Sequence, residues 1–225
     1  MSWLLYGIVN DNAQLVLEPT LQLIKAAGLA AIVKGCDTEI SREPAVVLAF
    51  GEQVQRLHQQ TTLVPMRYGS VLADEGLVIT HLRDHQARYQ TRLAELDNCE
   101  EMGLRITLDA LPDDIMTTPQ PVSGYHYLLA RKRAYAIPEQ AKQQADRVNA
   151  ALAGLYRQHC AALSVFNGCQ TYLLSYLVPR NQLPAFCERL NALADNSADL
   201  GFISGPWPPY NFAAEPTGLE VSHDD

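Results

Sequence analysis

The 225-residue sequence is poor in positive charge. It holds 17 Lys and Arg against 25 Asp and Glu, for a formal net charge of −8. Proteins that bind nucleic acid without sequence preference neutralise phosphates with Lys and Arg, and anionic membrane surfaces attract clusters of the same residues. We therefore expect neither nucleic acid nor a membrane among the partners of this protein.

Long apolar runs and ordered cysteine motifs are also missing. No apolar run approaches the roughly 20 residues needed to cross a bilayer, and the first residues lack the basic and apolar regions of a secretory signal. The five cysteines are odd in number, irregularly spaced and without a C-x-x-C pair: Cys36, Cys99, Cys160, Cys169 and Cys187. This pattern is typical of reduced, mostly buried thiols. We expect a cytoplasmic protein.

Motifs of nucleotide-binding and hydrolytic sites are absent too, namely G-x-G-x-x-G, G-x-x-x-x-G-K-[ST] and G-x-S-x-G. His81 and His85 lie four residues apart on a predicted helix, so both could face one metal ion, but no third ligand is identified. His159 and Cys160 are adjacent, and neighbouring helical residues point about 100° apart, so they do not form a nucleophile–base pair. We expect no catalytic residue, no metal and no cofactor.

Apolar periodicity predicts an α+β chain. In the first half the predicted strands and helices alternate. The strands are residues 3–9, 29–33, 61–66 and 103–108, and the helices are 21–27 with Gly28 as C-cap, 47–57 and 77–96. Glu100 and Glu101 fall at the start of an element and are not placed as an acid–base couple.

A domain boundary is expected where the composition changes. Residues 111–121 are rich in Pro, Asp and Thr and have little apolar periodicity, so we predict domains at 1–110 and 122–212, with a linker between them and a flexible tail at 213–225. The second domain is predicted to hold a long helix or a helix pair, depending on whether Pro138 kinks one helix or starts another. The apolar stripe of that helix begins at Ala141 and runs to His159.

Three further elements are predicted in the second domain. Asn167-Gly168 lies between two β-prone runs, which indicates a hairpin with a type I′ turn. A helix at 183–193 and a last strand at 200–203 follow. Both domains would then be α+β units of the split βαβ type.

The segment 205–212 reads Gly-Pro-Trp-Pro-Pro-Tyr-Asn-Phe. Pro206, Pro208 and Pro209 fix φ and remove backbone donors, so the segment cannot continue as a helix or a central strand. One interpretation is a final strand whose aromatic residues close the core. The other is a docking surface, because a stiff strip bearing Trp207, Tyr210 and Phe212 loses little entropy when it binds. The two interpretations are compatible.

Two other stretches are candidates for partner contact. Arg131, Lys132 and Arg133 form a compact basic cluster, which is either a solvated helix face or a contact for an acidic partner segment. In the run from Pro65, Arg67 and Tyr68 precede Gly69, which permits a sharp turn. Arg67 could pair with a buried carboxylate or face a partner, and the sequence does not decide between them.

Several stretches, taken in order, resemble the gas vesicle protein F/L family (GvpF/GvpL). The matching residues are 5–9 (Leu-Tyr-Gly-Ile-Val), 64–71 (Val-Pro-Met-Arg-Tyr-Gly-Ser-Val), 101–106 (Glu-Met-Gly-Leu-Arg-Ile), Gly124 with Tyr127-Leu128, 131–133, 176–178 and 205–212. They span nearly the whole chain, and the last octapeptide is the most specific. The family tends to have Phe at Tyr68, Thr at Ser70 and Ser at Asn211, which leaves the paralogue open.

The resemblance implies a non-enzymatic accessory protein of gas vesicle assembly, a minor component of these buoyancy organelles. It implies two domains, the N-terminal one modified ferredoxin-like. It also implies binding to the hydrophobic shell protein GvpA, which would be kept from aggregating during nucleation, and contact with other minor gas vesicle proteins. The alternatives are a scaffold for other accessory proteins, or a small-molecule-binding or enzymatic α+β protein.

Overall fold

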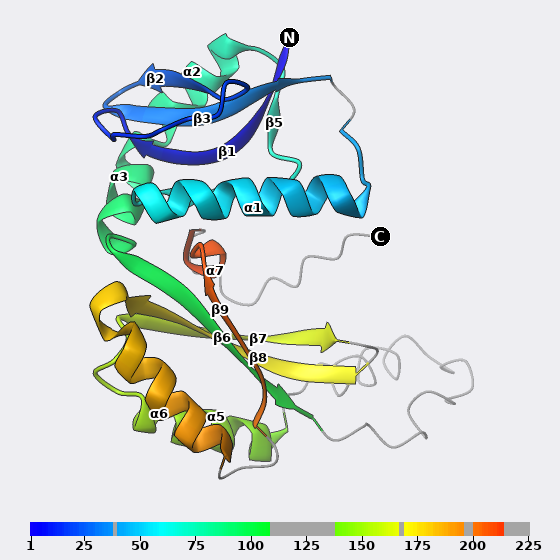
Figure 1. Cartoon of the computed structure of the whole chain (residues 1–225), viewed down its shortest axis with the longest axis vertical. Coiled ribbons are helices and arrows are strands. Elements are labelled where there is room, and N and C mark those ends of the chain that lie inside the picture. Colours follow the sequence, from blue (N-terminus) through cyan, green and yellow to red (C-terminus); the bar gives the residue numbers. More distant parts are fainter. Residues whose placement is uncertain (38–39, 109–137, 167–168, 196–199, 214–225) are drawn as a thin grey trace, which may run out of the picture. The chain divides into compact units, whose positions relative to one another are not determined.

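The computed structural model describes residues 1–37, 40–108, 138–166, 169–195 and 200–213. It confirms an α+β protein with two sheets. The chain forms two compact units (Figure 1). Unit 1 is Met1–Glu101 with Pro206–Asp225, and unit 2 is Met102–Gly205. The C-terminal aromatic segment thus belongs to the same unit as the N-terminus.

The sheet of unit 1 is built around its first strand. β1 (Ser2–Asn10) pairs antiparallel with β3 (Leu29–Cys36) along its whole length, with a register shift between Leu5 and Gly7. On its other side β1 pairs with the short strands β4 (Val64–Pro65) and β5 (Val71–Leu72). β2 (Gln22–Ala26) pairs with β3, which gives the order β2-β3-β1-β4.

The helix predicted at residues 21–27 is wrong, because Gln22–Ala26 is strand β2. Ala26 pairs with Leu29, and the two residues between them, Ala27 and Gly28, have φ angles of 55° and 75°. Two consecutive positive φ angles make the tight turn that matches the twist of an antiparallel pair. Gly28 therefore serves a hairpin turn and not a helix C-cap, and pairing with β3 overrides the short helical period.

Three helices complete unit 1: α1 (Pro44–Gln60), α2 (Glu75–Asp84) and α3 (Gln86–Glu95). The α1 prediction is confirmed. The single helix predicted at 77–96 is two helices that meet at His85, whose φ and ψ are −109° and 15°. The Nδ1 atom of His85 donates to the carbonyl of His81 at 2.9 Å, a local bond that competes with helical geometry. Asp74 caps α2 by accepting a hydrogen bond from the backbone N–H of Leu77 at 2.8 Å.

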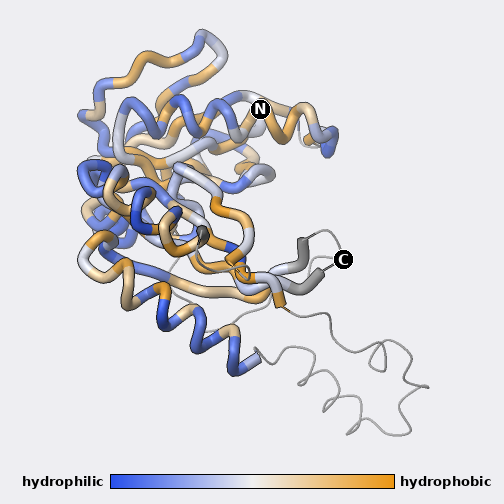
Figure 2. The backbone as a smooth tube through the Cα atoms, turned by 60° about the horizontal axis from the view of Figure 1, so that its bottom comes forward, coloured by the Kyte–Doolittle hydropathy of each residue, from blue (hydrophilic) through white to orange (hydrophobic). Residues whose placement is uncertain are grey.

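α1 and α2 lie on opposite faces of the unit 1 sheet (Figure 1). Along the helices hydrophilic residues alternate with hydrophobic ones (Figure 2), as expected of helices with one buried face. Phe50, Val54 and Leu57 of α1 pack with Tyr6 and Ile32 of the sheet, all of them buried. The sequence predicts one apolar face from Val47, Phe50, Val54 and Leu57, at i, i+3, i+7 and i+10. The structure confirms it at the last three residues, whereas Val47 is 39% exposed.

Unit 2 is built on a four-stranded sheet. Its strands are β6 (Cys99–Thr107), β7 (Gln158–Phe166), β8 (Cys169–Pro179) and β9 (Leu200–Trp207), in the order β7-β8-β6-β9. β7 and β8 are antiparallel from Gln158↔Leu177 to Phe166↔Cys169. The turn predicted at 167–168 lies outside the described residues. The final strand is confirmed, and it is longer than expected.

The helices of unit 2 are α5 (Glu139–Ala151) and α6 (Leu183–Asp195), with the short helix η2 (Arg180–Gln182) before α6. Ala145 and Val148 of α5 pack in the core with Tyr176 of β8 and Phe186 of α6. His159 does not continue the helical stripe. It lies exposed on β7, because the chain leaves the helix near Gly154, whose φ is 86°.

Among the described elements, unit 2 follows the succession strand, helix, strand, strand, helix, strand of a split βαβ unit. In unit 1 the strands β1, β2 and β3 follow one another without a helix between them, so the structure does not confirm a ferredoxin-like N-terminal part. The predicted linker at 111–121, the basic cluster at 131–133 and the tail from residue 214 lie outside the described residues.

Candidate functional site

The C-terminal segment returns to unit 1 after β9. Pro208 and Pro209 are buried, and α7 (Tyr210–Ala213) follows them and contacts β4. The backbone N–H of Tyr210 donates to the carbonyl of Pro208 at 2.8 Å. Phe212 is 6% exposed, whereas Trp207 is 52% exposed. Phe212 is thus a core residue, and Trp207 is the large apolar side chain that the segment presents to solvent.

Glu101 fixes this segment. Its two carboxylate oxygens accept hydrogen bonds from the backbone N–H of Asn211 at 2.9 Å and from the side-chain amide of Asn211 at 2.5 Å. The neighbouring Glu100 lies 2.9 Å from Nε2 of His58, and both of these side chains are buried. Sequence reasoning missed both contacts because it started the strand at residue 103, whereas β6 starts at Cys99. A buried carboxylate needs a hydrogen-bond or ionic partner. Two adjacent carboxylates within a buried strand would therefore have predicted such partners, had the strand been predicted to include them.

The three candidates Arg67, Tyr68 and Gly69 have separate structural roles. The Tyr68 hydroxyl donates to the carbonyl of Ser41 at 2.6 Å, and its ring meets Phe50 edge-on at 5.2 Å. Gly69 has a φ of 96°, a conformation that favours glycine. Arg67 is exposed and lines a cavity of about 200 Å³ together with Tyr210. The structure therefore brings Arg67 and the C-terminal segment together, while Tyr68 faces another pocket.

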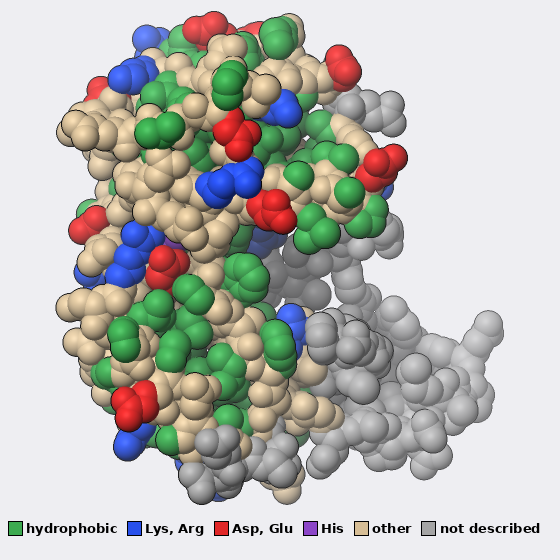
Figure 3. All heavy atoms as spheres, in the orientation of Figure 1, with side chains coloured by type: hydrophobic (Ala, Val, Ile, Leu, Met, Phe, Trp, Pro, Cys, Tyr) green, Lys and Arg blue, Asp and Glu red, His purple; other side chains and the backbone are tan. Residues whose placement is uncertain are grey.

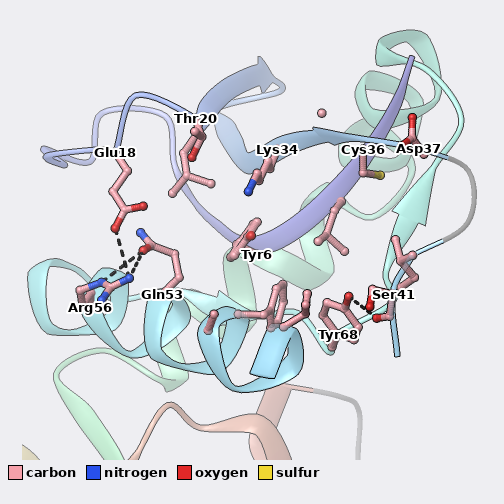
Figure 4. A pocket seen from close by; sticks show the side chains of 17 residues that line it. Tyr6, Glu18, Thr20, Lys34, Cys36, Asp37, Ser41, Gln53, Arg56 and Tyr68 are labelled. Atoms are coloured by element: carbon pink, nitrogen blue, oxygen red, sulfur yellow. Dashed lines mark hydrogen bonds and ion pairs between the residues drawn. The ribbon is translucent and has the colours of Figure 1, made fainter. Parts of the chain in front are cut away.

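That other pocket, of about 490 Å³, lies between α1 and the β1–β3 strands (Figure 4). Tyr6 and Phe50 stack at its floor with ring centroids 4.5 Å apart. At one end Arg56 forms an ion pair with Glu18 at 3.1 Å, and at the other end Tyr68 bonds to Ser41. Burial, and then the neighbouring Tyr68, raise the pKa of Tyr6, so its hydroxyl stays neutral near pH 7.

The N-terminal part of α1, residues 44–49, forms an apolar rim beside this pocket. Val46, Val47 and Leu48 are 40%, 39% and 67% exposed, and Val46 and Ala49 line the pocket itself. Figure 3 shows hydrophobic side chains gathered over this end of α1. Solvent-exposed apolar residues that are contiguous on one helix mark an interaction site more often than single ones do.

His81 and His85 do come together, with ring centroids 4.5 Å apart. His81 is bonded to the Tyr89 hydroxyl at 2.7 Å, and burial, the adjacent His85 and the charge of Arg88 lower its pKa. No group of three or more His, Cys, Asp or Glu able to hold a metal occurs in the described part of the chain. No described helix combines the length and apolarity needed to cross a membrane.

Comparison with known proteins decides the family. The model of the family "Gas vesicle synthesis protein GvpL/GvpF" matches residues 2–214. The chain belongs to the GvpL/GvpF family. Gas vesicle protein L of a Streptomyces species is 27% identical over 71% of this chain and 65% of its own length. Gas vesicle protein F2 of Halobacterium salinarum is 25% identical over 96% of this chain and 93% of its own length.

Solved GvpF structures share the fold of this GvpL/GvpF protein. The GvpF structure from Anabaena has a TM-score of 0.70 at 15% identity and covers 100% of this chain and 98% of its own. GvpF from Microcystis aeruginosa has the same TM-score and identity and covers 95% and 99%. The resemblance that rested on residues 64–71 and 205–212 is thereby confirmed, and the chain is a gas vesicle synthesis protein.

Proposed function

We propose that this GvpL/GvpF protein is a non-enzymatic assembly factor that binds the hydrophobic shell protein GvpA and prevents its aggregation while gas vesicles nucleate. The observation that carries the proposal is the apolar rim of α1, residues 44–49, beside the aromatic floor of the larger pocket. Family membership supplies the gas vesicle context.

The physical argument starts from the partner. A very hydrophobic shell subunit exposes apolar surface before it is built into the wall, and such surface drives aggregation. The rim offers three side chains whose burial against that surface would each contribute up to about 1.5–3 kcal/mol. The net charge of −8 keeps the assembly factor from associating with itself while it holds an apolar partner.

A purely catalytic role finds no support at either cavity. None of the described residues that line the cavity at Arg67 is a His, Asp, Glu or Cys, so they supply no conventional general base. In the larger pocket the carboxylates of Glu18 and Asp37 are among the lining residues, and Glu18 is engaged by Arg56. Binding, and not bond making, is the activity that the side chains of these two cavities suit.

The test measures light scattering while unfolded GvpA is diluted into buffer with or without the protein. We expect the wild-type chain to suppress scattering, and Leu48→Gln to bind GvpA about tenfold more weakly because a buried leucine is replaced by an amide. Leu77→Gln is the matched control, since Leu77 is also helical and 46% exposed but lies on α2. Equal GvpA binding by wild type and both variants would exclude the α1 rim.

The same assay distinguishes a GvpA-binding assembly factor from the alternative, a scaffold for other gas vesicle accessory proteins. Trp207 is the other large exposed side chain of unit 1 in the described residues that the sequence singled out. A chain that fails to suppress GvpA scattering, but captures another purified gas vesicle protein through Trp207, is a scaffold and not a holder of shell subunits. Trp207→Ala compared with wild type decides whether that capture uses this residue.

A further inference from the structure

A second cavity of unit 1 holds two arginines that have no acidic partner among the described residues. It measures about 200 Å³ and lies between the end of β4, the start of α3 and α7. Arg67 reaches it from the turn after β4, and Arg88 from the first turn of α3. Neither arginine forms an ion pair within the part of the chain that the structure describes.

The described lining of the cavity carries no negative charge to offset the two guanidinium groups. No Asp or Glu is among the described residues that line it, and the first turn of α3 carries no acidic residue. The positive end of the α3 dipole adds to the charge of Arg88. The field of Arg88 reaches its neighbours, since it lowers the pKa of His81 after the larger effects of burial and His85. In an acidic protein this is a local site for an anion.

Hydroxyl donors and an apolar wall complete the cavity. Tyr210 and Ser70 line it beside the arginines, and burial raises the pKa of Tyr210 to about 12, so its phenol keeps its proton at neutral pH. Pro65 and Met66 supply the wall. A phosphate ion has no apolar part that could contact this wall. A glutamate side chain has methylene groups that can pack against the wall while its carboxylate binds the guanidinium groups.

We infer that this cavity binds a carboxylate side chain of an acidic peptide segment, held by Arg67 and Arg88. The site is separate from the α1 rim and does not depend on the binding of shell protein there. It also explains why the aromatic segment is anchored so firmly. Glu101 fixes Asn211, and thereby α7, and α7 contributes Tyr210 to the cavity.

The carboxylate could come from a partner or from this chain, because Ala213 lines the cavity and Glu215 and Glu220 follow in the sequence. The probe is a capped Gly-Glu-Glu-Gly peptide, with capped Gly-Gln-Gln-Gly as its neutral match. Binding to the full chain is followed by NMR of the arginine Nε–H groups at low salt. Arg67→Gln and Arg88→Gln assign the two signals, and Arg83→Gln, an exposed α2 arginine outside the cavity, controls for net charge.

We expect the Glu peptide to shift both signals saturably and the Gln peptide to shift neither. Each cavity variant should bind about tenfold more weakly, since a charge-assisted bond is lost, while Arg83→Gln binds as wild type. A chain carrying Glu215→Gln and Glu220→Gln identifies the source. If its arginine signals move before any peptide is added, the site takes this chain's own glutamates; if they do not, it takes a partner's. Equal shifts with both peptides, or no shift in any of these chains, would overturn the inference.

Discussion

The contact between Glu101 and Asn211 offers the sharpest test of how the C-terminal segment is held. Both oxygens of Glu101 accept hydrogen bonds, and this side chain is 6% exposed. A hydrogen bond to a charged group contributes about 1.5–3 kcal/mol. Asn211 is exposed, so water partly replaces its bonds when Glu101 is removed. We expect Glu101→Leu to lower the free energy of unfolding by about 3 kcal/mol in total.

A double-mutant cycle isolates the side-chain bond from the other contacts of Glu101. Asn211→Ala removes the amide but keeps the backbone N–H, so the coupling between Glu101→Leu and Asn211→Ala reports the amide bond alone. We expect a coupling of about 1.5 kcal/mol, the lower end for a charge-assisted bond, because the site is open to water on the Asn211 side. Free energies come from urea unfolding followed by circular dichroism.

The result that would refute this reasoning is a coupling below about 0.5 kcal/mol, which is within the error of independent sites. Glu101→Gln provides a further check, because an amide can accept only one of the two bonds and presents a donor to the other. The free energy of unfolding of Glu101→Gln should lie between those of the wild type and Glu101→Leu. A Gln variant as stable as wild type would mean that the second bond contributes nothing.

Three other predictions concern the same unit. Phe212→Ala should lower the free energy of unfolding, measured in urea, by about 3–5 kcal/mol because Phe212 is 6% exposed. Trp207→Ala should lower it by less than about 1 kcal/mol, and equal losses would contradict the difference in burial. Gly69→Ala should lower the melting temperature, because Gly69 has a φ of 96° that alanine rarely adopts. The matched Gly51→Ala should raise it, because Gly51 lies in the middle of a helix and a Cβ added there meets nothing within 4 Å. A change of the same sign in both variants would refute this reasoning from backbone conformation. Burial raises the pKa of Tyr210 from 10.0 to about 12, so between these pH values the unfolded chain loses this proton and the folded chain keeps it. The free energy of unfolding should therefore fall from pH 10 to pH 12, and it should fall less in Tyr210→Phe. Parallel pH curves for the two chains would contradict this prediction.

The elements that the sequence predicted well are those whose burial is periodic and local. The buried face of α1 was predicted from the spacing of Phe50, Val54 and Leu57, and strand β3 was predicted from the apolar run at 29–33. The helix predicted at 21–27 is wrong because seven residues are too few to distinguish a helical period from an edge strand, and pairing with β3 decided the outcome. The long helix at 77–96 failed at His85, where a side-chain bond to His81 interrupts it.

The candidate residues were found by residue type, and their partners were not. The sequence singled out Arg67 and Tyr210 separately, 143 positions apart, and only the fold places them at one cavity. The sequence places Glu100 and Glu101 at the start of an element and identifies no partner for either. Burial in β6 is what gives them His58 and Asn211 as partners. The helical period predicts that Val47 belongs to the core face of α1, but Val47 is 39% exposed in the apolar rim.

By itself the sequence determined the α+β class and the resemblance to the family, because these depend on local residue order. It did not determine the form of residues 205–212. Strand β9 runs on to Trp207, and Tyr210–Ala213 is the helix α7, so the prediction that the prolines exclude a helix from this segment is wrong. The tertiary structure alone decided which aromatic residues of that segment are buried, since burial depends on distant chain segments that meet in space. Phe212 packs into unit 1 and Trp207 does not, although they are only five residues apart. Long-range contacts, which no local pattern encodes, buried one side chain and left the other exposed to solvent.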